Sequence, residues 1–269
     1  MRRLLTLATL FASLLPLSSA AVEVSTQDNL KSAWEDTSAS TITIASPIEI
    51  KGCGEAWSAG ASSITLTGKT GTEQLHLSSS DMGQLAYAQM LASDVTIEKL
   101  SLKNDDAVYL LQATSVTLNN VTIAASSAQS AVAAVDVTLN LNLSGTLTLD
   151  LNSPCYKLLS RSDSLTCNTD FSGIIINIGN GFRLGDNGVT YLMEFRGTAP
   201  TLDQLKCTVS GGSGQRVTIR TEQGSAYLCL EVPEPGSATL TLIGLIALLH
   251  RRRRRPCGRG IHGGAYVRG

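Results

Sequence analysis

A short tripeptide recurs through the first half of the chain and restricts the folds that it can adopt. Each copy holds an apolar residue, a threonine and a second apolar residue, and successive copies are 22, 31, 21 and 21 residues apart. In a strand, the two apolar side chains lie on one face and the threonine lies on the other. The copies are Ile42-Thr43-Ile44, Ile64-Thr65-Leu66, Val95-Thr96-Ile97, Val116-Thr117-Leu118 and Val137-Thr138-Leu139.

A spacing near 21 residues is the length of one coil in a parallel β-solenoid, where each coil buries its apolar face only against the next coil. We therefore expect an all-β fold with a parallel β-solenoid (β-helix-like) body over residues 22–152. The alternative is an antiparallel β-sandwich whose strands resemble one another by chance. Leu100 and Leu102 correspond to Val121 and Ile123 in the following copy, and Asn119-Asn120 lies where a strand would turn.

Residues 153–231 predict a small antiparallel β region, either a cap on the solenoid or a second module. Solenoids need caps because their end coils expose core and unpaired backbone. Asp186-Asn187-Gly188 and Gly211-Gly212-Ser213-Gly214 predict tight turns. Strands are expected at 156–160, 173–179, 189–195, 216–221 and 226–232. The only helix-like pieces are Asn29 to Glu35 and Ala86 to Leu91.

The charge of this central part is strongly acidic. All 22 Asp and Glu residues lie between Glu23 and Glu234, with only 12 of the 21 Lys and Arg residues, so the formal net charge there is −10. Nucleic-acid binding needs clustered cations and is not expected. An acidic polysaccharide is disfavoured as a ligand unless metal ions bridge it to the protein.

The first 20 residues have the features of a secretory signal peptide. Arg2 and Arg3 precede an apolar stretch from Leu4 to Leu17, and small residues lead to a predicted cleavage site beside Ala20 and Ala21. The alternatives are a membrane anchor or a buried helix. We expect cleavage before Ala21 or Val22.

A second terminal pattern lies near the C-terminus. Val232, Pro233, Glu234 and Pro235 precede an apolar run from Ala238 to Leu249, followed by Arg251, Arg252, Arg253, Arg254 and Arg255. Arginines of this kind stay on the cytoplasmic side of a membrane. The run is twelve residues long and would form a helix of about 18 Å, against about 30 Å of hydrocarbon. The run therefore suits a processed signal, and the alternative is a weak tether.

In these residues the chain resembles the PEP-CTERM sorting tail over 232–255. That resemblance implies an N-terminal signal helix, a C-terminal sorting helix and processing by an exosortase-like membrane enzyme. It implies passage through the export machinery and the inner membrane to the cell surface or extracellular matrix of a double-envelope bacterium. Recognition would fall on Pro233, Glu234 and Pro235, and the five arginines would act as the stop. Family members usually end after the basic cluster, whereas residues 256–269 follow it here and are expected to be disordered.

The six cysteines suit an exported chain, where disulfides are permitted. The local pairs indicated by sequence separation are Cys155 with Cys167 and Cys207 with Cys229, which leaves Cys53 unpaired. Connectivity does not follow from sequence alone. No metal site or cofactor is expected, because no Cys-x-x-Cys or Cys-x-x-His spacing occurs and His76 is the one histidine of the central part.

No catalytic residues are predicted. Asp94 and Asp136 would lie two coils apart, about 10 Å, with Ser115 between them, and Asp105-Asp106 follows another copy of the repeat. Solvated strand ends explain these carboxylates more simply than a polysaccharide lyase or glycosidase centre, which needs converging carboxylates. His76 is expected on the surface.

Two tryptophans and a glycine-rich segment have simple structural explanations. Trp34 and Trp57 are expected to anchor the core rather than stack on sugars. Gly179-Asn180-Gly181, with Gly185, is expected to turn the chain rather than bind a nucleotide.

Two functions follow from this sequence. The first is an exported, non-enzymatic cell-surface or extracellular-matrix protein. The second is a secreted protein that binds or cleaves carbohydrate on the same scaffold, with extracellular polysaccharide as its partner. Three or more carboxylates within about 6 Å in a groove would favour the second, and a smooth Thr/Ser/Asn face would favour the first.

Overall fold

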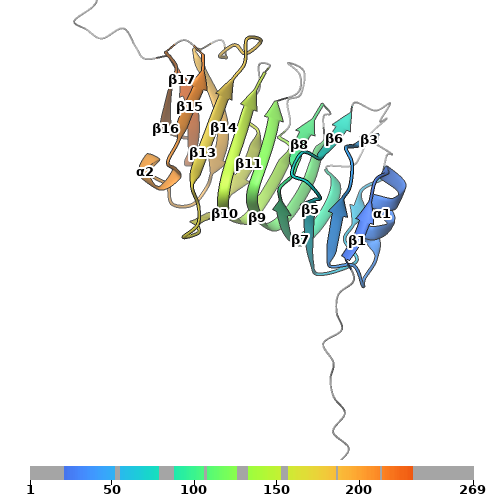
Figure 1. Ribbon diagram of the computed structural model, residues 1–269. Coiled ribbons are helices and arrows are strands. Elements are labelled where there is room, and N and C mark those ends of the chain that lie inside the picture. Colours follow the sequence, from blue (N-terminus) through green and yellow to red (C-terminus); the bar gives the residue numbers. More distant parts are fainter. Residues whose placement is uncertain are drawn as a thin grey trace, which may run out of the picture. The chain divides into compact units, whose positions relative to one another are not determined.

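The computed structural model describes residues 21–51, 55–78, 88–105, 108–125, 133–152, 157–185, 187–212 and 214–232. The chain divides into one unit that ends at Glu231 and a second from Val232 onward. The first unit is a parallel β-solenoid, whose strands lie side by side between α1 and the C-terminal strands (Figure 1). The expected all-β solenoid is confirmed. The leader, the residues from Pro233 onward, and Cys53, Cys155 and Cys257 lie outside the described residues.

Three stacks of strands form the walls of the solenoid, and we call them faces A, B and C. A complete coil passes through face C, then face A, then face B. Face A contains β1 (Ala21–Val24), β2 (Thr41–Ile44), β5 (Ser63–Gly68), the later part of β7 (Ala88–Glu98), the middle of β9 (Tyr109–Ala125) and of β10 (Val135–Leu151), and β12 (Ser164–Cys167).

The other two faces are built from the remaining strands. Face B contains β3 (Ile48–Lys51), β6 (Gln74–Ser78), β8 (Ser101–Asn104), the ends of β9 and β10, β13 (Gly173–Ile178) and β15 (Thr208–Gly211). Face C contains β4 (Trp57–Ser58), the starts of β7, β9 and β10, β11 (Leu159–Ser162) and β14 (Val189–Phe195).

The register on face A confirms the central copies of the repeat. Ile64 lies beside Val95, and Val95 lies beside Val116, so these three copies stack directly. On face B, Leu102 lies beside Ile123 as expected. The apolar residues of these copies point inward and the threonines point outward, as the alternation predicts.

The two outer copies of the repeat are out of register with the others. Thr41 lies beside Thr65, so the first copy is displaced by two residues. The last copy lies partly outside face A, because the register between β10 and β9 shifts between Val137 and Asn140. Asn142 takes the position opposite Thr117, and Leu139 is 47% exposed. A β-bulge adds residues that simple spacing does not reveal.

The corner between faces A and B has a repeated left-handed backbone. Lys99, Asn120 and Gly145 occupy equivalent positions in successive coils, with φ values of 50°, 54° and 55°. The prediction that Asn119-Asn120 marks a turn is confirmed. At Gly145 an added Cβ would lie 2.5 Å from Asn120 Oδ1, and that oxygen accepts a hydrogen bond from the Thr146 amide. Lys99 and Asn120 adopt the same conformation with a side chain, so glycine is favoured at 145 mainly because a Cβ there would displace the Asn120 side chain from this hydrogen bond.

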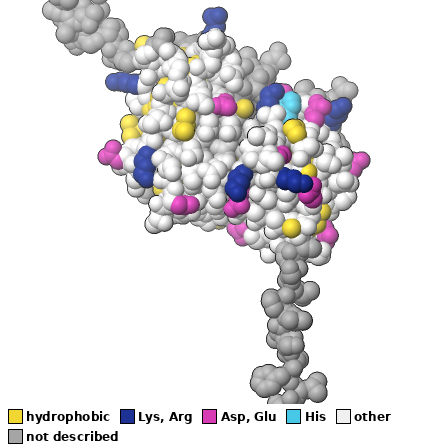
Figure 2. All heavy atoms as spheres, viewed as in Figure 1, with side chains coloured by type: hydrophobic (Ala, Val, Ile, Leu, Met, Phe, Trp, Pro, Cys, Tyr) yellow, Lys and Arg dark blue, Asp and Glu magenta, His cyan; other side chains and the backbone are white. Residues whose placement is uncertain are grey.

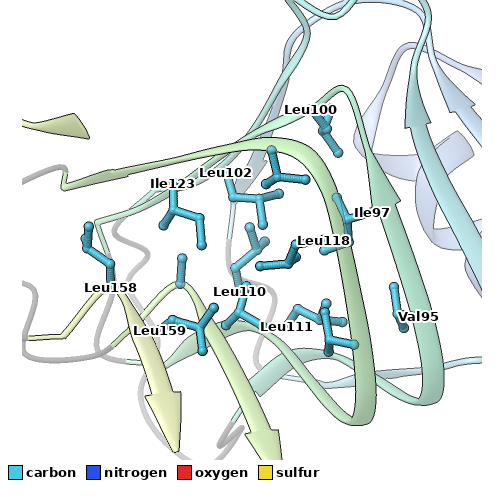
Figure 3. Packing of buried hydrophobic residues seen from close by; sticks show 14 of the residues in the cluster. Val95, Ile97, Leu100, Leu102, Leu110, Leu111, Leu118, Ile123, Leu158 and Leu159 are labelled. Atoms are coloured by element: carbon cyan, nitrogen blue, oxygen red, sulfur yellow. The ribbon is translucent and has the colours of Figure 1, made fainter. Parts of the chain in front are cut away.

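The core is a continuous column of aliphatic side chains that point inward from all three faces (Figure 3). Face A contributes Val95, Ile97 and Leu118. Face B contributes Leu102 and Ile123, and all five are at most 2% exposed. Since each coil covers the apolar side chains of its neighbours, no coil is stable alone.

The N-terminal end of the column is covered by α1 (Gln27–Glu35), which confirms the helix expected from Asn29 to Glu35. Thr26 caps the helix by accepting a hydrogen bond from the Asn29 amide. Leu30, Ala33 and Trp34 form its buried side. The second helix expectation is wrong: Ala88 to Leu91 belong to β7, because they continue face C.

The C-terminal end differs from the prediction in its topology. Parallel pairing does not stop near residue 152, because β12 and β13 pair with β10, β14 pairs with β11, and β15 pairs with β13. Among the described residues, two strand pairs are antiparallel. β17 (Ser225–Glu231) pairs with β16 (Arg216–Glu222) on one side and with β14 on the other. The expected strands are present, but most of them extend the solenoid. A short helix, α2 (Leu202–Leu205), precedes β15.

Candidate functional site

The outward side of face A carries a continuous row of short polar side chains. One residue from each successive strand lies beside the next, in the register Thr41, Thr65, Thr96, Thr117, Asn142 and Thr166. All six are partly or fully exposed. Neighbouring strands are about 4.8 Å apart, so the row presents a hydrogen-bonding group at that interval along the solenoid. We call these six residues the hydroxyl row.

Two further outward rows flank the hydroxyl row. On one side lie Ser63, Asp94, Ser115, Asn140 and Ser164, and on the other lie Glu23, Thr43, Thr67, Glu98, Asn119 and Ser144. The three rows are about 7 Å apart, because alternate residues of a strand share a face. On the side of the molecule that Figure 2 views, uncharged groups predominate and charged side chains are scattered.

Hydrogen bonds between coils hold several of these side chains in place. Asn142 Nδ2 donates to Thr117 Oγ1 at 3.4 Å, and Ser164 Oγ donates to Asn140 Oδ1 at 2.7 Å. Asn119 Nδ2 donates to Glu98 at 3.4 Å. Such bonds fix the orientation of hydroxyl and amide groups before a ligand arrives, which lowers the entropic cost of binding.

The carboxylates that the sequence singled out do not converge. Ser115 lies between Asp94 and Asn140, not between Asp94 and Asp136. Asp136 lies on face C, on the other side of the bulge in β10, so the expected 10 Å relation between the two aspartates is wrong. Within the described residues, no group of three or more His, Cys, Asp or Glu side chains could hold a metal ion.

Asp136 takes part in a buried polar contact. Its side chain is fully buried, accepts a hydrogen bond from Gln112 Nε2 at 2.9 Å and lies 3.8 Å from Arg161 Nε. Gln112 is its register partner on β9. A buried carboxylate needs such partners, and this contact joins three successive coils on face C.

The surface prediction for His76 agrees with its place on face B. His76 lies between the buried Leu75 and Leu77 and points outward, where its Nε2 is 2.5 Å from Asp105 Oδ2. Lys103 Nζ is 3.6 Å from the same carboxylate. Asp105 is therefore a partner of two basic groups at the surface, and Asp106 lies outside the described residues.

The predictions for the tryptophans and for the Gly179 to Gly185 segment agree with the structure. Trp34 and Trp57 are fully buried, and Trp34 Nε1 donates to the Trp57 carbonyl at 3.2 Å. The amide of Phe182 donates to the carbonyl of Gly179, which closes a turn. Core anchoring and a turn are thus the observed roles.

The cysteines differ from the expected pairing. Cys167, Cys207 and Cys229 are free thiols, so the Cys207–Cys229 bond is not formed and Cys167 is not bonded to Cys155. Burial raises the pKa of the Cys229 thiol to about 12. Cys229 lies on the outer side of β17, whereas Leu228 and Leu230 point into the core.

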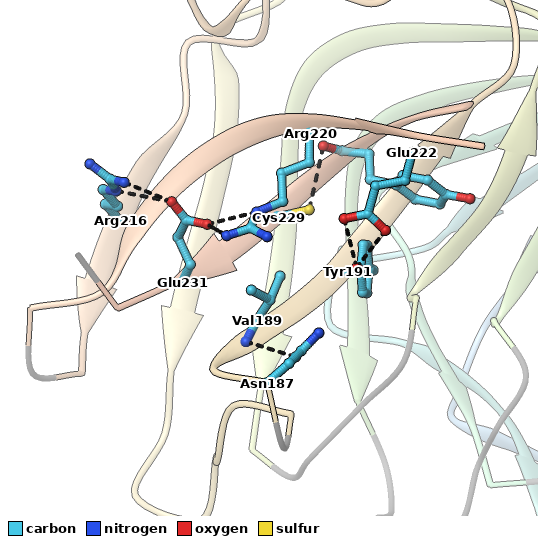
Figure 4. A network of polar contacts seen from close by, with 9 residues as sticks. Asn187, Val189, Tyr191, Arg216, Arg220, Glu222, Cys229 and Glu231 are labelled. Carbon is cyan, nitrogen blue, oxygen red and sulfur yellow. Dashed lines mark hydrogen bonds and ion pairs between the residues drawn. The ribbon is translucent and has the colours of Figure 1, made fainter. Parts of the chain in front are cut away.

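A polar network on β14, β16 and β17 was not anticipated from the sequence (Figure 4). Glu231 accepts hydrogen bonds from both Arg216 and Arg220. Tyr191 donates to Glu222 at 2.8 Å, which raises the pKa of the tyrosine to about 12. Arg216 and Arg220 are four residues apart and so share one side of a strand, which was the available sequence indication.

Burial alone would raise the pKa of Glu231, but the hydrogen bonds from Arg220 and Arg216 outweigh it and the pKa is lowered. The carboxylate is therefore ionised and held at the end of β17, directly before Val232. Val232 is 53% exposed. The remaining predicted sorting residues, Pro233 to Arg255, lie outside the described residues, as does Ala20.

Among the described residues, neither helix has the length and apolar character needed to cross a membrane. Ala21 is the first residue of β1 and lies beside Thr41.

Comparison with known proteins gives no match: no family model, no curated protein and no solved structure is similar to this chain.

Proposed function

We propose that this chain is an exported, non-enzymatic protein of the cell surface or extracellular matrix, sorted by a PEP-CTERM-like tail. The observation that carries the proposal is the hydroxyl row, an ordered array of outward Thr and Asn side chains on face A. Short, uncharged, hydrogen-bonding groups at a constant interval suit contact with hydrated extracellular material. Catalysis of glycan cleavage would instead need paired carboxylates.

The placement of the two terminal motifs supports this proposal. The solenoid starts at Ala21, next to the predicted leader cleavage site, and its last strand ends at Glu231, next to the predicted sorting motif. The described strands therefore lie in the part of the chain between the two motifs, which is the part that the proposed processing would retain.

The proposed sequence of events follows from the chemistry of each segment. The leader directs the chain to the export machinery and is removed beside Ala20 and Ala21. The apolar run enters the inner membrane while Arg251 to Arg255 remain on the cytoplasmic side. An exosortase-like enzyme then recognises Pro233, Glu234 and Pro235 and releases the solenoid to the surface or matrix.

Mass spectrometry of the protein recovered from cells and from the medium tests this proposal. We expect an N-terminus at Ala21 or Val22 and loss of the segment after Pro235. A variant with Pro233→Ala and Glu234→Gln should keep the apolar run and accumulate in the inner membrane fraction. Intact termini on a cytosolic protein would overturn the proposal.

The same face gives a second candidate, binding or cleavage of an extracellular polysaccharide, because its hydroxyl and amide groups could pair with those of a sugar. A triple variant, Thr65→Val, Thr96→Val and Thr117→Val, removes three hydroxyls while keeping β-branched side chains. Thr122→Val with Thr148→Val on face B is the matched control. Selective loss of sedimentation with insoluble polysaccharide would favour binding, and release of new sugar ends would favour cleavage.

A further inference from the structure

Cys167 occupies the last core-facing position of one row on face A. In this row Leu66, Ile97, Leu118 and Leu143 lie side by side in successive coils, and Cys167 lies beside Leu143. The four aliphatic residues are at most 1% exposed. Cys167 is partly exposed, because β12 is the last described strand on face A. Its thiol therefore points toward the core at the C-terminal end of the column.

Cys207 occupies the equivalent end position on face B. Thr208 lies beside Ile175, so Cys207, one residue earlier, lies beside Ile174. Ile174 is fully buried and in turn lies beside Leu147. Cys207 thus continues a core-facing row and packs against the hydrophobic core, as Cys167 does.

These two rows meet at the corner formed by residues 168–172, and Lys206 ties the last coil to that corner. Lys206 Nζ donates to the Phe171 carbonyl at 2.7 Å. An added Cβ on Gly173 would lie 2.5 Å from the Lys206 carbonyl oxygen, so the backbone beside Cys207 is in close contact with this corner. A hollow of about 530 Å³ at the same corner is lined by both Cys167 and Lys206.

The pKa values of the two thiols agree with this placement. Burial is the main cause that raises the pKa of Cys207 to about 12, and the nearby Cys167 makes a smaller contribution to the same shift. Burial also raises the pKa of Cys167, while Lys206 lowers it. Both thiols are therefore protonated as they stand, and the pair presents two reduced groups at one corner.

We propose that Cys167 and Cys207 form a disulfide in the exported protein and so fasten the last coil to the coil before it. Cys167 and Cys207 lie beside Leu143 and Ile174, on either side of one corner, and are not cross-strand partners. A disulfide spans about 4.4–6.8 Å between Cα atoms, so the two chain segments must close on that corner as the bond forms. The pairing rests on the proposed export, because disulfides persist in oxidising compartments.

The reaction is a thiol–disulfide exchange. Each cysteine loses its Sγ-bound hydrogen, one Sγ–Sγ bond forms, and the two protons pass, directly or through solvent, to the sulfurs of the partner whose own S–S bond breaks. The two electrons reduce the disulfide of an oxidoreductase or of a low-molecular-weight partner, which leaves as two thiols.

The alternative pairings with Cys229 join less favourable places in the fold. Cys229 lies near Arg220 and Glu231, on the side of β17 opposite the core-facing Leu228 and Leu230. Cys167 is at the corner of faces A and B instead. Cys155 lies outside the described residues, and the peptide mapping below tests its pairing.

Tryptic mapping without reduction tests the proposal directly, because the relevant cysteines fall in different peptides. Cleavage after Lys and Arg places Cys167 in Ser162–Arg183 and Cys207 in Cys207–Arg216, whereas Cys155 and Cys229 fall in Asn104–Lys157 and Thr221–Arg251. The purified full chain is equilibrated with a reduced and oxidised glutathione couple. We expect Ser162–Arg183 and Cys207–Arg216 to be linked, about 2 Da lighter than the sum of the two peptides.

Three variants sharpen the test. Cys167→Ser should leave Cys207 free to a thiol reagent, and Cys207→Ser should leave Cys167 free. Cys229→Ser is the control and should keep the link. A link between any other pair, or two free thiols in the equilibrated wild type, would overturn the proposal.

The test of the disulfide and the test of the proposed function can fail independently of each other. The glutathione experiment does not depend on export, so a cytosolic location would leave its result standing. Conversely, a protein recovered from the medium with correctly processed termini and free Cys167 and Cys207 would overturn the disulfide alone.

Discussion

The two ends of the solenoid differ in how they cover the hydrophobic core of the terminal coils. At the N-terminal end, one amphipathic helix covers the column, and Leu30 and Trp34 are fully buried beneath it. At the C-terminal end, α2 has four residues and buries only Leu205. There β15 is exposed at every residue, and Leu202 and Val209 are 39% and 37% exposed. The comparison shows that the N-terminal end is closed by a buried helix, α1, which we call the N-terminal plug, and the C-terminal end by the antiparallel strands β16 and β17.

The edges of the terminal strands differ in the same way. At the N-terminal end, the Gln27 side chain donates to the Lys51 carbonyl and accepts from the Lys51 amide, both at 3.0 Å. The side-chain amide of Gln27 thus makes the two hydrogen bonds to Lys51 that the backbone of a neighbouring strand would make. At the C-terminal end, the last parallel strand, β15, pairs with β13 alone among the described residues, and a hollow lined by Leu202, Val209 and Val217 lies beside it. Uncovered edges invite pairing with other chains.

The largest expected effect is at the N-terminal plug. Trp34→Ala removes a fully buried ring and the hydrogen bond from its Nε1 to Trp57. We expect a loss of about 3–5 kcal/mol in the free energy of unfolding, measured by urea denaturation. Leu30→Ala at this end and Leu205→Ala at the other are the like-for-like pair, because both leucines are fully buried, and we expect the Leu205 change to cost less. Equal losses would mean that both ends are plugged alike.

The next effect is at the C-terminal network. Glu231→Gln removes the charge that Arg216 and Arg220 share, with an expected loss of about 1–3 kcal/mol. Added salt should reduce the difference between wild type and variant, because the arginines are 55% and 41% exposed. Glu222→Gln, which removes a charge but keeps an acceptor for Tyr191, is the control. A salt-independent difference would show that packing, not charge, holds β17.

A smaller effect is expected from the side chain that closes the β3 edge. Gln27→Ala removes two hydrogen bonds to Lys51, and we expect a loss of about 0.5–1.5 kcal/mol. Hydrogen exchange of the Lys51 amide should accelerate, while exchange of amides within face A stays unchanged. Ser32→Ala, on the exposed side of the same helix, controls for helix effects. Unchanged exchange at Lys51 would show that the edge is protected by other means.

The smallest expected effect is a loss of stability at acidic pH that depends on Glu73. The Glu73 carboxylate accepts from the Thr70 hydroxyl at 2.7 Å and from the amides of Thr70 and Gly71. The Thr70 hydroxyl is the main cause of its pKa falling from 4.5 to about 2. Because the folded pKa is the lower one, this stabilisation is complete above pH 4.5 and is lost as the pH falls toward about 2.

Urea denaturation of wild type and Glu73→Gln across that range measures this loss. The difference in unfolding free energy should shrink as the pH falls. A difference that is constant with pH would contradict the role of the ionised carboxylate.

The strands were predictable from local alternation, whereas their partners were not. Val116-Thr117-Leu118 predicts a strand because its apolar side chains alternate with threonine. Val137-Thr138-Leu139 and Leu141-Asn142-Leu143 alternate equally well, and only the bulge in β10 decides which triplet joins face A. A bulge depends on how coils of different length stack, which no local pattern records.

The same reasoning explains the candidate site. The outward threonines followed from the repeat, but the order of the hydroxyl row required the register. The contacts of Asp136 could not be predicted from the sequence, because its partners Gln112 and Arg161 come from neighbouring coils. The cysteine pairs were chosen by separation in sequence, whereas the pair that we propose, Cys167 and Cys207, is 40 residues apart.

The position of β17 has a mechanical consequence. It is the middle strand of the C-terminal sheet, with β14 on one side and β16 on the other, and its end leads to Val232. If the chain is held beyond that residue, the component of a pulling force along the strand axis acts on β17. The ladder bonds on both sides are then loaded in shear and must break together, with the Arg216 and Arg220 contacts to Glu231 at the point of attachment. β17 would resist such a force better than an edge strand would, because it is paired on both sides.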